Sequence, residues 1–250
     1  LQEHNAIGVL DLKTNAFTEL IGLGLKNFSA VGNEIDPNHK DSKIELRAAA
    51  VQGLYQPDAI AAYKFKGKTY LVMANEGDTR EDDGDKKRVK DAGLPGYPAD
   101  LKELNISTTD SVSGAELITF GGRSFSIRDS AGNLVFDSGN QLDAAAVAAG
   151  IYDDGRSDDK GVEPEGVELF KVRGRTLAFI GLERTKKSAI AVYDVTDPRE
   201  AQYLDLIVVD GDISPEGLKA FRMAGQNYLA VANEVSGTTS LIRFDYTPKK

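Results

Sequence analysis

Three stretches of this 250-residue chain repeat one pattern. A proline opens each stretch, a glutamate closes it 19 positions later, and a glycine separates two short apolar runs between them. The stretches run from Pro57 to Glu76, from Pro164 to Glu183 and from Pro215 to Glu234. Repetition at this scale is typical of architectures built from similar units. The fold must therefore contain one supersecondary unit at least three times.

Each repeat is predicted to be a β-hairpin. The apolar runs are short and rich in β-branched and aromatic residues, and the glycines between them, Gly67, Gly174 and Gly225, each follow or precede a basic or small residue. Such a glycine between two alternating segments is typical of a tight turn joining antiparallel strands.

Further strands extend the hairpins. The second repeat continues into strands at Ser188–Asp194 and Tyr203–Val209, which makes four antiparallel strands, the content of one propeller blade of about 45 residues. The first repeat resumes with Ser124–Asp129 and Leu134–Asp137, and the third reaches Thr239–Tyr246, one strand short. The pattern thus predicts an all-β chain, a β-propeller of four-stranded blades.

The predicted ring is partial. Ile7–Leu12 and Phe17–Leu23 are interpreted as the outer strands of an upstream blade, and three and a half blades cannot close a ring that typically needs four to eight. An immunoglobulin-like sandwich has strands at similar spacing but does not predict the repeated register. The expected division is 1–55 (outer strands and a loop), 56–140 (a blade with a long insertion), 141–210 (a short helix, an acidic loop and a blade) and 211–250 (a blade lacking its last strand).

The remaining segments are predicted insertions. Glu34–Ala49 is expected to be a polar loop and Asp78–Asp100 a charge-dense loop, which carries Asp82-Asp83-Gly84-Asp85 and a basic run, Lys86 to Lys90, expected to be solvated.

One short helix is predicted over Gln141–Ala149. Asp143 is expected to cap it and Gly150 to terminate it. The acidic segment Asp153–Gly161 follows and is open to two interpretations, a solvated loop or a Ca²⁺ site.

Composition narrows the chemistry. The chain has 30 Lys and Arg against 39 Asp and Glu, a net charge of −9, which disfavours nucleic acid as a partner. It has no Cys, which excludes thiolate chemistry. Only His4 and His39 could supply imidazole, which disfavours a multi-histidine zinc site. No apolar run is long enough for a transmembrane segment. The predicted chemistry therefore uses oxygen ligands.

Paired carboxylates are the main candidate site. In a hairpin, the start of the first strand and the end of the second lie at the same end. The predicted channel rim consists of Asp58, Glu76, Glu165, Glu183, Glu216 and Glu234, with Arg184 beside it. Clustered carboxylates favour a hard cation such as Ca²⁺. The candidate metal ligands are Asp78, Asp153, Asp154, Asp158, Asp159 and Glu165.

Structural roles remain open for the same residues. Each repeated acidic residue could instead bond backbone amides of a neighbouring blade. Arg123, Arg156 and Arg184 could bind an anionic ligand or serve as counter-ions.

The sequence also resembles a known family. The resemblance spans nearly the whole chain and rests on six motifs: Gln56-Pro57-Asp58-Ala59-Ile60-Ala61, Ala74-Asn75-Glu76-Gly77-Asp78-Thr79-Arg80, Gly122-Arg123-Ser124-Phe125-Ser126-Ile127, Arg156-Ser157-Asp158-Asp159-Lys160-Gly161, Phe179-Ile180-Gly181-Leu182-Glu183-Arg184 and Ala232-Asn233-Glu234-Val235-Ser236-Gly237-Thr238-Thr239. In these the chain is similar to the choice-of-anchor I domain proteins, secreted bacterial proteins related to the mesenchyme-specific cell surface glycoprotein and sometimes described as alkaline-phosphatase-like.

The resemblance implies a secreted or cell-surface propeller, expected to have seven blades in the full-length protein and to be fused to anchoring or other domains. It transfers no catalytic residues. Two functions stay open: a calcium-stabilised scaffold that binds a surface protein or polysaccharide, and a calcium-dependent phosphoesterase in which the metal would bind a small anionic ligand.

Overall fold

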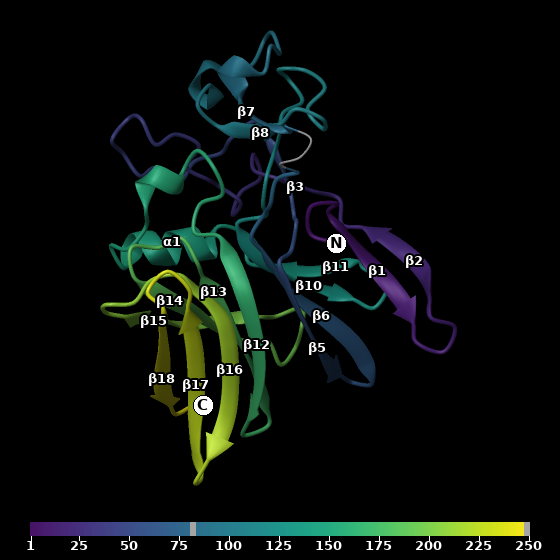
Figure 1. The fold of residues 1–250 in the computed structure, drawn as a ribbon, viewed down its shortest axis with the longest axis vertical. Coiled ribbons are helices and arrows are strands. Elements are labelled where there is room, and N and C mark those ends of the chain that lie inside the picture. Colours follow the sequence, from purple (N-terminus) through teal and green to yellow (C-terminus); the bar gives the residue numbers. More distant parts are fainter. Residues whose placement is uncertain (81–83, 248–250) are drawn as a thin grey trace. The chain divides into compact units, whose positions relative to one another are not determined.

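The computed structural model describes residues 1–80 and 84–247, and its chain divides into two compact units. Unit 1 comprises residues 1–58, 75–124 and 138–163, and unit 2 comprises residues 59–74, 125–137 and 164–250. Asp82 and Asp83 of the predicted charge-dense loop lie outside the described residues. The regular structure is mainly antiparallel β-sheet, as predicted (Figure 1).

Unit 2 consists of three sheets, one from each repeat. The strands are β5 (Ala59–Phe65), β6 (Lys68–Asn75), β10 (Ser124–Asp129) and β11 (Leu134–Asp137) in the first sheet; β12 (Pro164–Val172), β13 (Arg175–Leu182), β14 (Ser188–Asp194) and β15 (Gln202–Val209) in the second; and β16 (Pro215–Met223), β17 (Gln226–Asn233) and β18 (Thr238–Phe244) in the third. Strands adjacent in this order are hydrogen-bonded neighbours. The predicted hairpins and their continuations are confirmed.

The backbone conformation of the turn explains why each repeat has a glycine between its two strands. The registers Phe65↔Lys68, Val172↔Arg175 and Met223↔Gln226 leave two-residue loops. In each loop both residues have positive φ, 47° and 79°, 49° and 77°, and 49° and 78°. Two positive φ values define a type I′ turn, whose twist matches that of the strands it joins, and glycine adopts such a conformation without strain. The predicted turn chemistry is therefore confirmed in all three copies.

The repeated proline also marks an unusual backbone conformation. The residues immediately before the three prolines, Gln56, Glu163 and Ser214, have φ of 45°, 51° and 57°. Residues before proline are normally extended, and the left-handed region costs a non-glycine residue about 1–2 kcal/mol. The Gln56 carbonyl accepts a hydrogen bond from the Gly77 amide at 3.0 Å, and the Ser214 carbonyl accepts one from the Glu234 amide at 2.8 Å. These backbone hydrogen bonds join the two ends of the first and third repeats.

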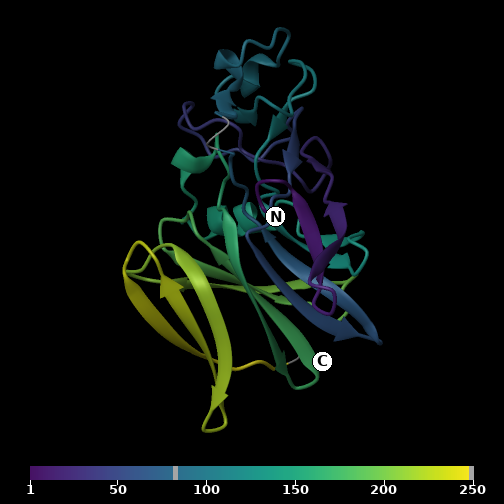
Figure 2. The same ribbon diagram turned by 45° about the vertical axis from the view of Figure 1, so that its right-hand side comes forward.

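First strands of the repeats lie together in unit 2. β5, β12 and β16 each form the edge of their own sheet, and β12 contacts both of the others. Figures 1 and 2 show β16 beside β12. Between the second and third sheets, a core that includes Phe179, Ile190 and Leu229 is closed to solvent.

Unit 1 holds the insertions. Its elements are β1 (Ala6–Asp11) and β2 (Ala16–Gly22), which form the predicted outer hairpin; β3 (Leu25–Asn27), β4 (Gln52–Leu54) and β9 (Ile118–Thr119), which form one sheet; β7 (Lys86–Arg88) and β8 (Asn105–Ser107), which form another; and the helix α1 (Gln141–Ala148). Short 3₁₀ turns lie at Val89–Asp91, Ala99–Leu101 and Asp154–Arg156. None of the helices in the described part of the chain is both long and apolar enough to cross a membrane.

The predicted loop over 34–49 is confirmed as irregular backbone, whereas the segment predicted as a loop over 78–100 contains β7 and 3₁₀ turns, and both segments contribute to a core that was not predicted. Ile35 and Ala49 of the first segment and Val89 of the second are buried in a hydrophobic core with Leu104 and Ile106. The apolar residues of these segments are widely separated among charged ones, so no periodicity marks them. Only the tertiary fold brings them together.

The helix is confirmed but its predicted cap is wrong. Asn140 occupies the N-cap position, and Gly150 follows the helix with φ of 70°, as expected of a terminator. Asp143 lies inside the first turn with a fully buried side chain. The Asp143 side chain therefore does not cap the helix and instead contacts residues outside it.

Candidate functional site

Hairpin registers place the predicted rim residues at strand ends. Pro164 pairs with Leu182 and Pro215 with Asn233, so in unit 2 each repeat brings its opening and closing acidic residues to one end of a hairpin. Glu165, Glu183, Glu216 and Glu234 belong to unit 2, whereas Asp58 and Glu76 belong to unit 1. Glu216 and Glu234 are exposed, and Glu183 is buried.

The buried Lys160 pairs with Glu76, the glutamate that closes the first repeat. Lys160 Nζ donates to Glu76 Oε1 at 2.6 Å and to the Gly77 carbonyl at 2.6 Å, and it lies 2.8 Å from Glu163 Oε2. Burial alone would lower the pKa of Lys160, but the charges of Glu163 and Glu76 outweigh it and raise that pKa above its ordinary value. Lys160 therefore stays charged and compensates Glu76.

Arg156 supplies a second cation to the same network. Its guanidinium contacts Glu163 Oε1, with the Nε at 2.7 Å, and donates to Asp159 Oδ2 at 2.9 Å. Glu163 is only 1% exposed, so two cations stabilise one buried carboxylate. Of the two roles left open for Arg156, the counter-ion is the one seen here.

Acidic-loop residues make contacts within unit 1. Asp153 Oδ1 accepts from the Gly155 amide at 3.0 Å, and Asp154 Oδ1 accepts from the Ser157 hydroxyl at 3.1 Å. Both contacts are local, and they fix the short turn that precedes the buried part of the loop.

Deeper in the loop, the carboxylates meet basic residues. Asp158 contacts Arg88, and its Oδ1 lies 2.8 Å from His39 Nδ1. Asp159 Oδ2 lies 3.7 Å from Lys86 Nζ, in addition to its bond with Arg156. Part of the basic run therefore pairs with buried acids and is not simply solvated.

Glu103 pairs with Lys90 and Arg88 of the basic run. Lys90 Nζ donates to both of its carboxylate oxygens, at 3.0 and 2.9 Å, and Arg88 Nη1 lies 3.5 Å from Oε2. The hydrogen bond from Lys90 is the main cause that lowers the pKa of Glu103 to about 2. No feature of the sequence singled out Glu103 beforehand.

Asp58 and Asp78 of unit 1 lie close enough for their like charges to act on each other. Desolvation by surrounding atoms and the negative charge of Asp78 raise the pKa of Asp58, and Lys160 opposes them. Asp78 Oδ1 accepts from the Thr79 amide at 2.7 Å. In unit 2, Arg184 Nη2 lies 2.8 Å from Glu183 Oε1.

Arg123 is a buried structural residue. It is 1% exposed, and its guanidinium donates to the carbonyls of Asp36, Ser157 and Asp159 at 3.1, 2.8 and 2.9 Å. Asp143 Oδ2 lies 3.9 Å from its Nη1. The side chain therefore ties the loops that contain Asp36 and Ser157 to its own segment. Of the two roles left open for Arg123, the structural one is seen here.

Asp143 should make stability depend on pH. Burial raises its pKa to about 6, and the charge of Arg123 and the amide of Val162 only partly oppose this. A raised pKa means that the folded state holds the proton more tightly than the unfolded state, so the contribution of Asp143 to stability is greatest below about pH 4 and falls as pH rises to about 6. Measured by urea unfolding, the stability of the wild type relative to Asp143→Asn should fall by roughly 2 kcal/mol over this range.

The matched control is Asp129→Asn. The side chain of Asn133 lowers the pKa of Asp129, so its contribution is present at neutral pH and lost as the pH falls. As the pH rises, the free energy of unfolding of the wild type should therefore fall relative to Asp143→Asn and rise relative to Asp129→Asn. If the difference in unfolding free energy between the wild type and Asp143→Asn does not change with pH, the raised pKa of Asp143 is contradicted.

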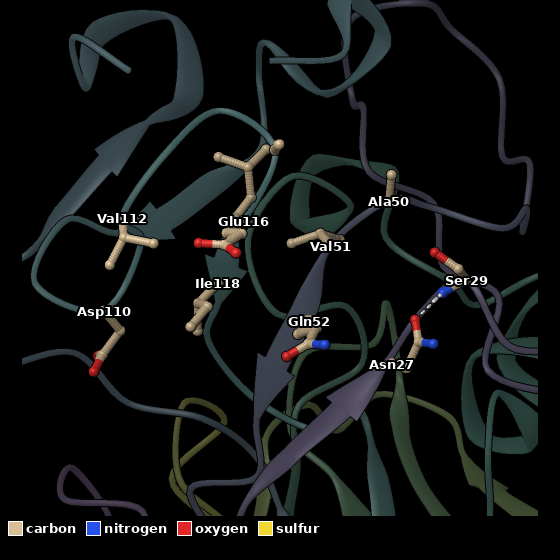
Figure 3. Close-up of a pocket in the computed structure, with 11 residues that line it drawn as sticks. Asn27, Ser29, Ala50, Val51, Gln52, Asp110, Val112, Glu116 and Ile118 are labelled. Carbon is tan, nitrogen blue, oxygen red and sulfur yellow. Dashed lines mark hydrogen bonds between the residues drawn. The ribbon is translucent and has the colours of Figure 1, made fainter. Parts of the chain in front are cut away.

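A cavity of about 410 Å³ lies in unit 1 beside the β3–β4–β9 sheet (Figure 3). Val51, Val112 and Ile118 give it aliphatic surface, and the exposed Gln52 and Glu116 give it polar groups. Its size falls within the range of small-molecule sites. None of the described lining residues is basic, so the cavity is poorly suited to a phosphate group.

The remaining polar lining residues are already bonded. Asn27 Oδ1 accepts from the Ser29 amide at 2.9 Å, and Asp110 Oδ2 accepts from Ser107 at 2.8 Å. Sequence reasoning missed this cavity because its residues come from three separate short strands and a loop, with no motif in common.

Comparison with models of protein families gives a match. The family model described as the choice-of-anchor I domain matches residues 1–198, which include unit 1 and most of the first two sheets of unit 2. No curated protein was found to match the chain.

Proposed function

The chain belongs to the choice-of-anchor I domain family, and from that premise we propose that it is a binding scaffold, built as part of a calcium-stabilised β-propeller. The family indicates a secreted or cell-surface associated module. The observation that carries the scaffold role is the pairing of the chain's own Lys and Arg with Glu76, Asp158, Asp159 and Glu183.

The propeller is supported by the arrangement of unit 2. Its sheets follow one another in sequence as meanders, and each begins at an edge strand that contacts the next. Blades of a propeller share this property, because their first strands surround the central channel.

The scaffold is better supported than the phosphoesterase. A calcium-dependent phosphoesterase needs carboxylates that are available to the metal, together with basic residues for the phosphate. Here two of the predicted metal ligands, Asp158 and Asp159, contact basic side chains, and the cavity in Figure 3 has no basic residue among its described lining.

Turnover of p-nitrophenyl phosphate with calcium present tests this choice. The scaffold predicts no turnover above background. Calcium-dependent turnover that is lost in Glu165→Gln or Glu216→Gln would overturn it in favour of the phosphoesterase.

Binding to an array of polysaccharides and surface proteins tests the scaffold directly. We expect a ligand for the cavity in Figure 3, weakened at least about fivefold by Glu116→Gln, since a hydrogen bond to a charged group contributes about 1.5–3 kcal/mol. Glu45→Gln, an exposed carboxylate outside the cavity, is the control. Equal binding by both variants would exclude the cavity as the binding site.

Calcium is proposed to bind Asp58 and Asp78 in unit 1, whose like charges a cation would compensate. At a concentration of about 100 times its Kd, calcium would stabilise the folded chain by about 2.7 kcal/mol. The melting temperature should therefore rise with Ca²⁺ and fall with EDTA, and Asp58→Asn should remove the response. Asp41→Asn, an exposed carboxylate elsewhere in unit 1, should keep it. A melting temperature indifferent to both additions would contradict the calcium proposal.

A further inference from the structure

The turn ends of the three hairpins in unit 2 are basic. Residues 64–68, 171–175 and 222–226 surround the turns, and seven of them are Lys or Arg while none is Asp or Glu, although the whole chain has a net charge of −9. All seven are exposed: Lys64, Lys66, Lys68, Lys171, Arg173, Arg175 and Arg222. We call these seven residues the basic hairpin ends.

The strand register places equivalent cations on neighbouring hairpins. Lys64, Lys171 and Arg222 occupy the same position in β5, β12 and β16, one pair back from the residue pair that closes each turn. β12 contacts both β5 and β16, and the three turns lie on the same side of unit 2 in Figures 1 and 2. The Arg222 guanidinium lies 5.8 Å from the centroid of the Phe170 ring, beside Lys171 in the sequence. The cations of adjacent hairpins therefore share one end of unit 2.

Six of the seven cations have no ion pair with a described residue. Arg175 has one, since its Nη1 lies 3.4 Å from Asp194 Oδ2. Two acids interact by charge with the hairpin ends and already accept hydrogen bonds from other side chains: Asp129, near Lys68, from Asn133, and Asp197, near Lys66, from Arg199. Like charges on neighbouring turns repel one another, so an anion that spans the turns would be stabilised there.

The turn geometry does not account for the cations. Lys66 and Arg173 occupy the first position of their type I′ turns, with φ of 47° and 49°. Asn, Asp and Gly are preferred at this position, because other residues adopt the left-handed conformation unfavourably. In the third repeat Ala224 takes the same position, with φ of 49°. The turn therefore forms without a cation, and the two basic residues are not required for local folding.

The surface around the cations favours one class of polyanion. Among residues 64–68, 171–175 and 222–226, all within the described chain, Met223 is the one large apolar side chain that is exposed. Stable binding to a membrane takes apolar insertion as well as charge, and nucleic acid is disfavoured by the net charge of the chain. An acidic polysaccharide carries carboxylate or sulfate groups along a hydrated chain, so it can be bound by exposed Lys and Arg alone.

We propose that the basic hairpin ends bind an acidic polysaccharide. Lys64, Lys171 and Arg222 would contact successive anionic groups of one polysaccharide chain, because they stand on three neighbouring hairpins. The proposal rests on the scaffold role and names a partner class for it, but it shares no residue with the cavity in Figure 3 or with the proposed calcium site. A scaffold whose ligand binds only in the cavity would leave the hairpin ends without a polysaccharide, so the two proposals can fail separately.

The experiment titrates the 250-residue chain into fluorescein-labelled heparin, which is sulfated, and into labelled oligogalacturonate, which is carboxylated. EDTA is present, so that calcium cannot bridge acidic groups. We expect saturable binding of at least one of the two by anisotropy, no binding of neutral dextran, and at least a tenfold loss of affinity between about 50 and 300 mM NaCl. Absence of binding to both would overturn the proposal. Tighter binding to poly(dT) or to phosphatidylserine-containing vesicles would also overturn it, because the partner would then be another class of polyanion.

A pair of substitutions locates the site. Lys64→Gln/Lys171→Gln removes an equivalent cation from two hairpins and should weaken binding at least about fivefold. Lys13→Gln/Lys43→Gln removes the same charge from exposed lysines of unit 1 and should change the affinity less than about twofold. Equal weakening by the two variants would mean that the polysaccharide responds only to net charge, which would contradict a site at the hairpin ends.

A second variant removes cations without threatening the fold. Lys66→Asn/Arg173→Asn places a preferred residue at the first position of two type I′ turns, so the melting temperature should not fall. The affinity for the polysaccharide should nevertheless fall at least about fivefold, as in the first variant. This variant decides the matter should Lys64→Gln/Lys171→Gln unfold the chain, and an unchanged affinity would overturn the proposal.

Discussion

Replacing Arg123 with methionine is expected to lower the free energy of unfolding by about 3–5 kcal/mol, the largest effect of any single substitution considered. The side chain is 1% exposed and donates to the carbonyls of Asp36, Ser157 and Asp159. Methionine fills a similar volume but donates nothing, so three carbonyl oxygens lose a charged donor in a site with little water. Urea unfolding followed by circular dichroism measures the loss.

The pH dependence of that loss distinguishes Arg123 from an ordinary core residue. Without the guanidinium, the buried Asp143 carboxyl has lost its main opposing positive charge, so its pKa should rise further above 6. The cost of Arg123→Met should therefore be greater at pH 8 than at pH 5. A purely steric role would give equal costs at both values.

Arg47→Met is the matched control in the same unit. Arg47 lies 2.6 Å from Asp100 in a partly exposed ion pair, with side chains 30% and 57% exposed. Pairs of this kind contribute about 0–1 kcal/mol. Equal losses of unfolding free energy in the two arginine variants would show that burial does not increase the contribution of Arg123 to stability.

Local structure in this chain was predictable because the repeat encodes it. Gly67, Gly174 and Gly225 marked three turns, and all three are type I′ turns of two residues. The continuations of the first two repeats into four-stranded sheets also followed from alternation and spacing. These features depend on neighbours a few positions away, which a single sequence displays directly.

Long-range pairing was not predictable in the same way. The partner of Glu76 is Lys160, 84 positions away, and Asp158 meets Arg88 across the insertion. Sequence reasoning found the carboxylates but could not tell a metal ligand from half of an ion pair. The distinction depends on which cation the fold brings close, and no local pattern records that.

The core of unit 1 was missed for a related reason. Ile35, Val89 and Leu104 each stand among polar residues, so neither a period of 2 nor one of 3.6 is present. The structural role of Arg123 was left open beside ligand binding, because its partners are carbonyl groups, which every residue possesses. The sequence therefore predicted the repeated sheets well and the inserted unit poorly.

Gly166→Ala is expected to destabilise the chain by about 3 kcal/mol, through the contact between β12 and β16. A Cβ at this position would lie 2.3 Å from the carbonyl oxygen of Glu216 and 3.3 Å from Leu218 Cγ. The nearer obstacle is backbone, which cannot rotate away as a side chain can. Relief therefore requires the two strands to separate.

The repeat itself provides the control for this prediction. Gly217 occupies the same place in the Pro-Glu-Gly sequence of the third repeat, but a Cβ there would meet only the Ala232 Cβ, at 3.3 Å. Gly217→Ala should cost about 0.5 kcal/mol or less in the same urea titration. Because the two substitutions are chemically identical and differ only in what faces them, equal costs would mean that β12 and β16 do not pack in solution as they do in this fold. A cost confined to Gly166→Ala, with faster hydrogen exchange in β16 and β17, would show that the sheets are held together at their first strands.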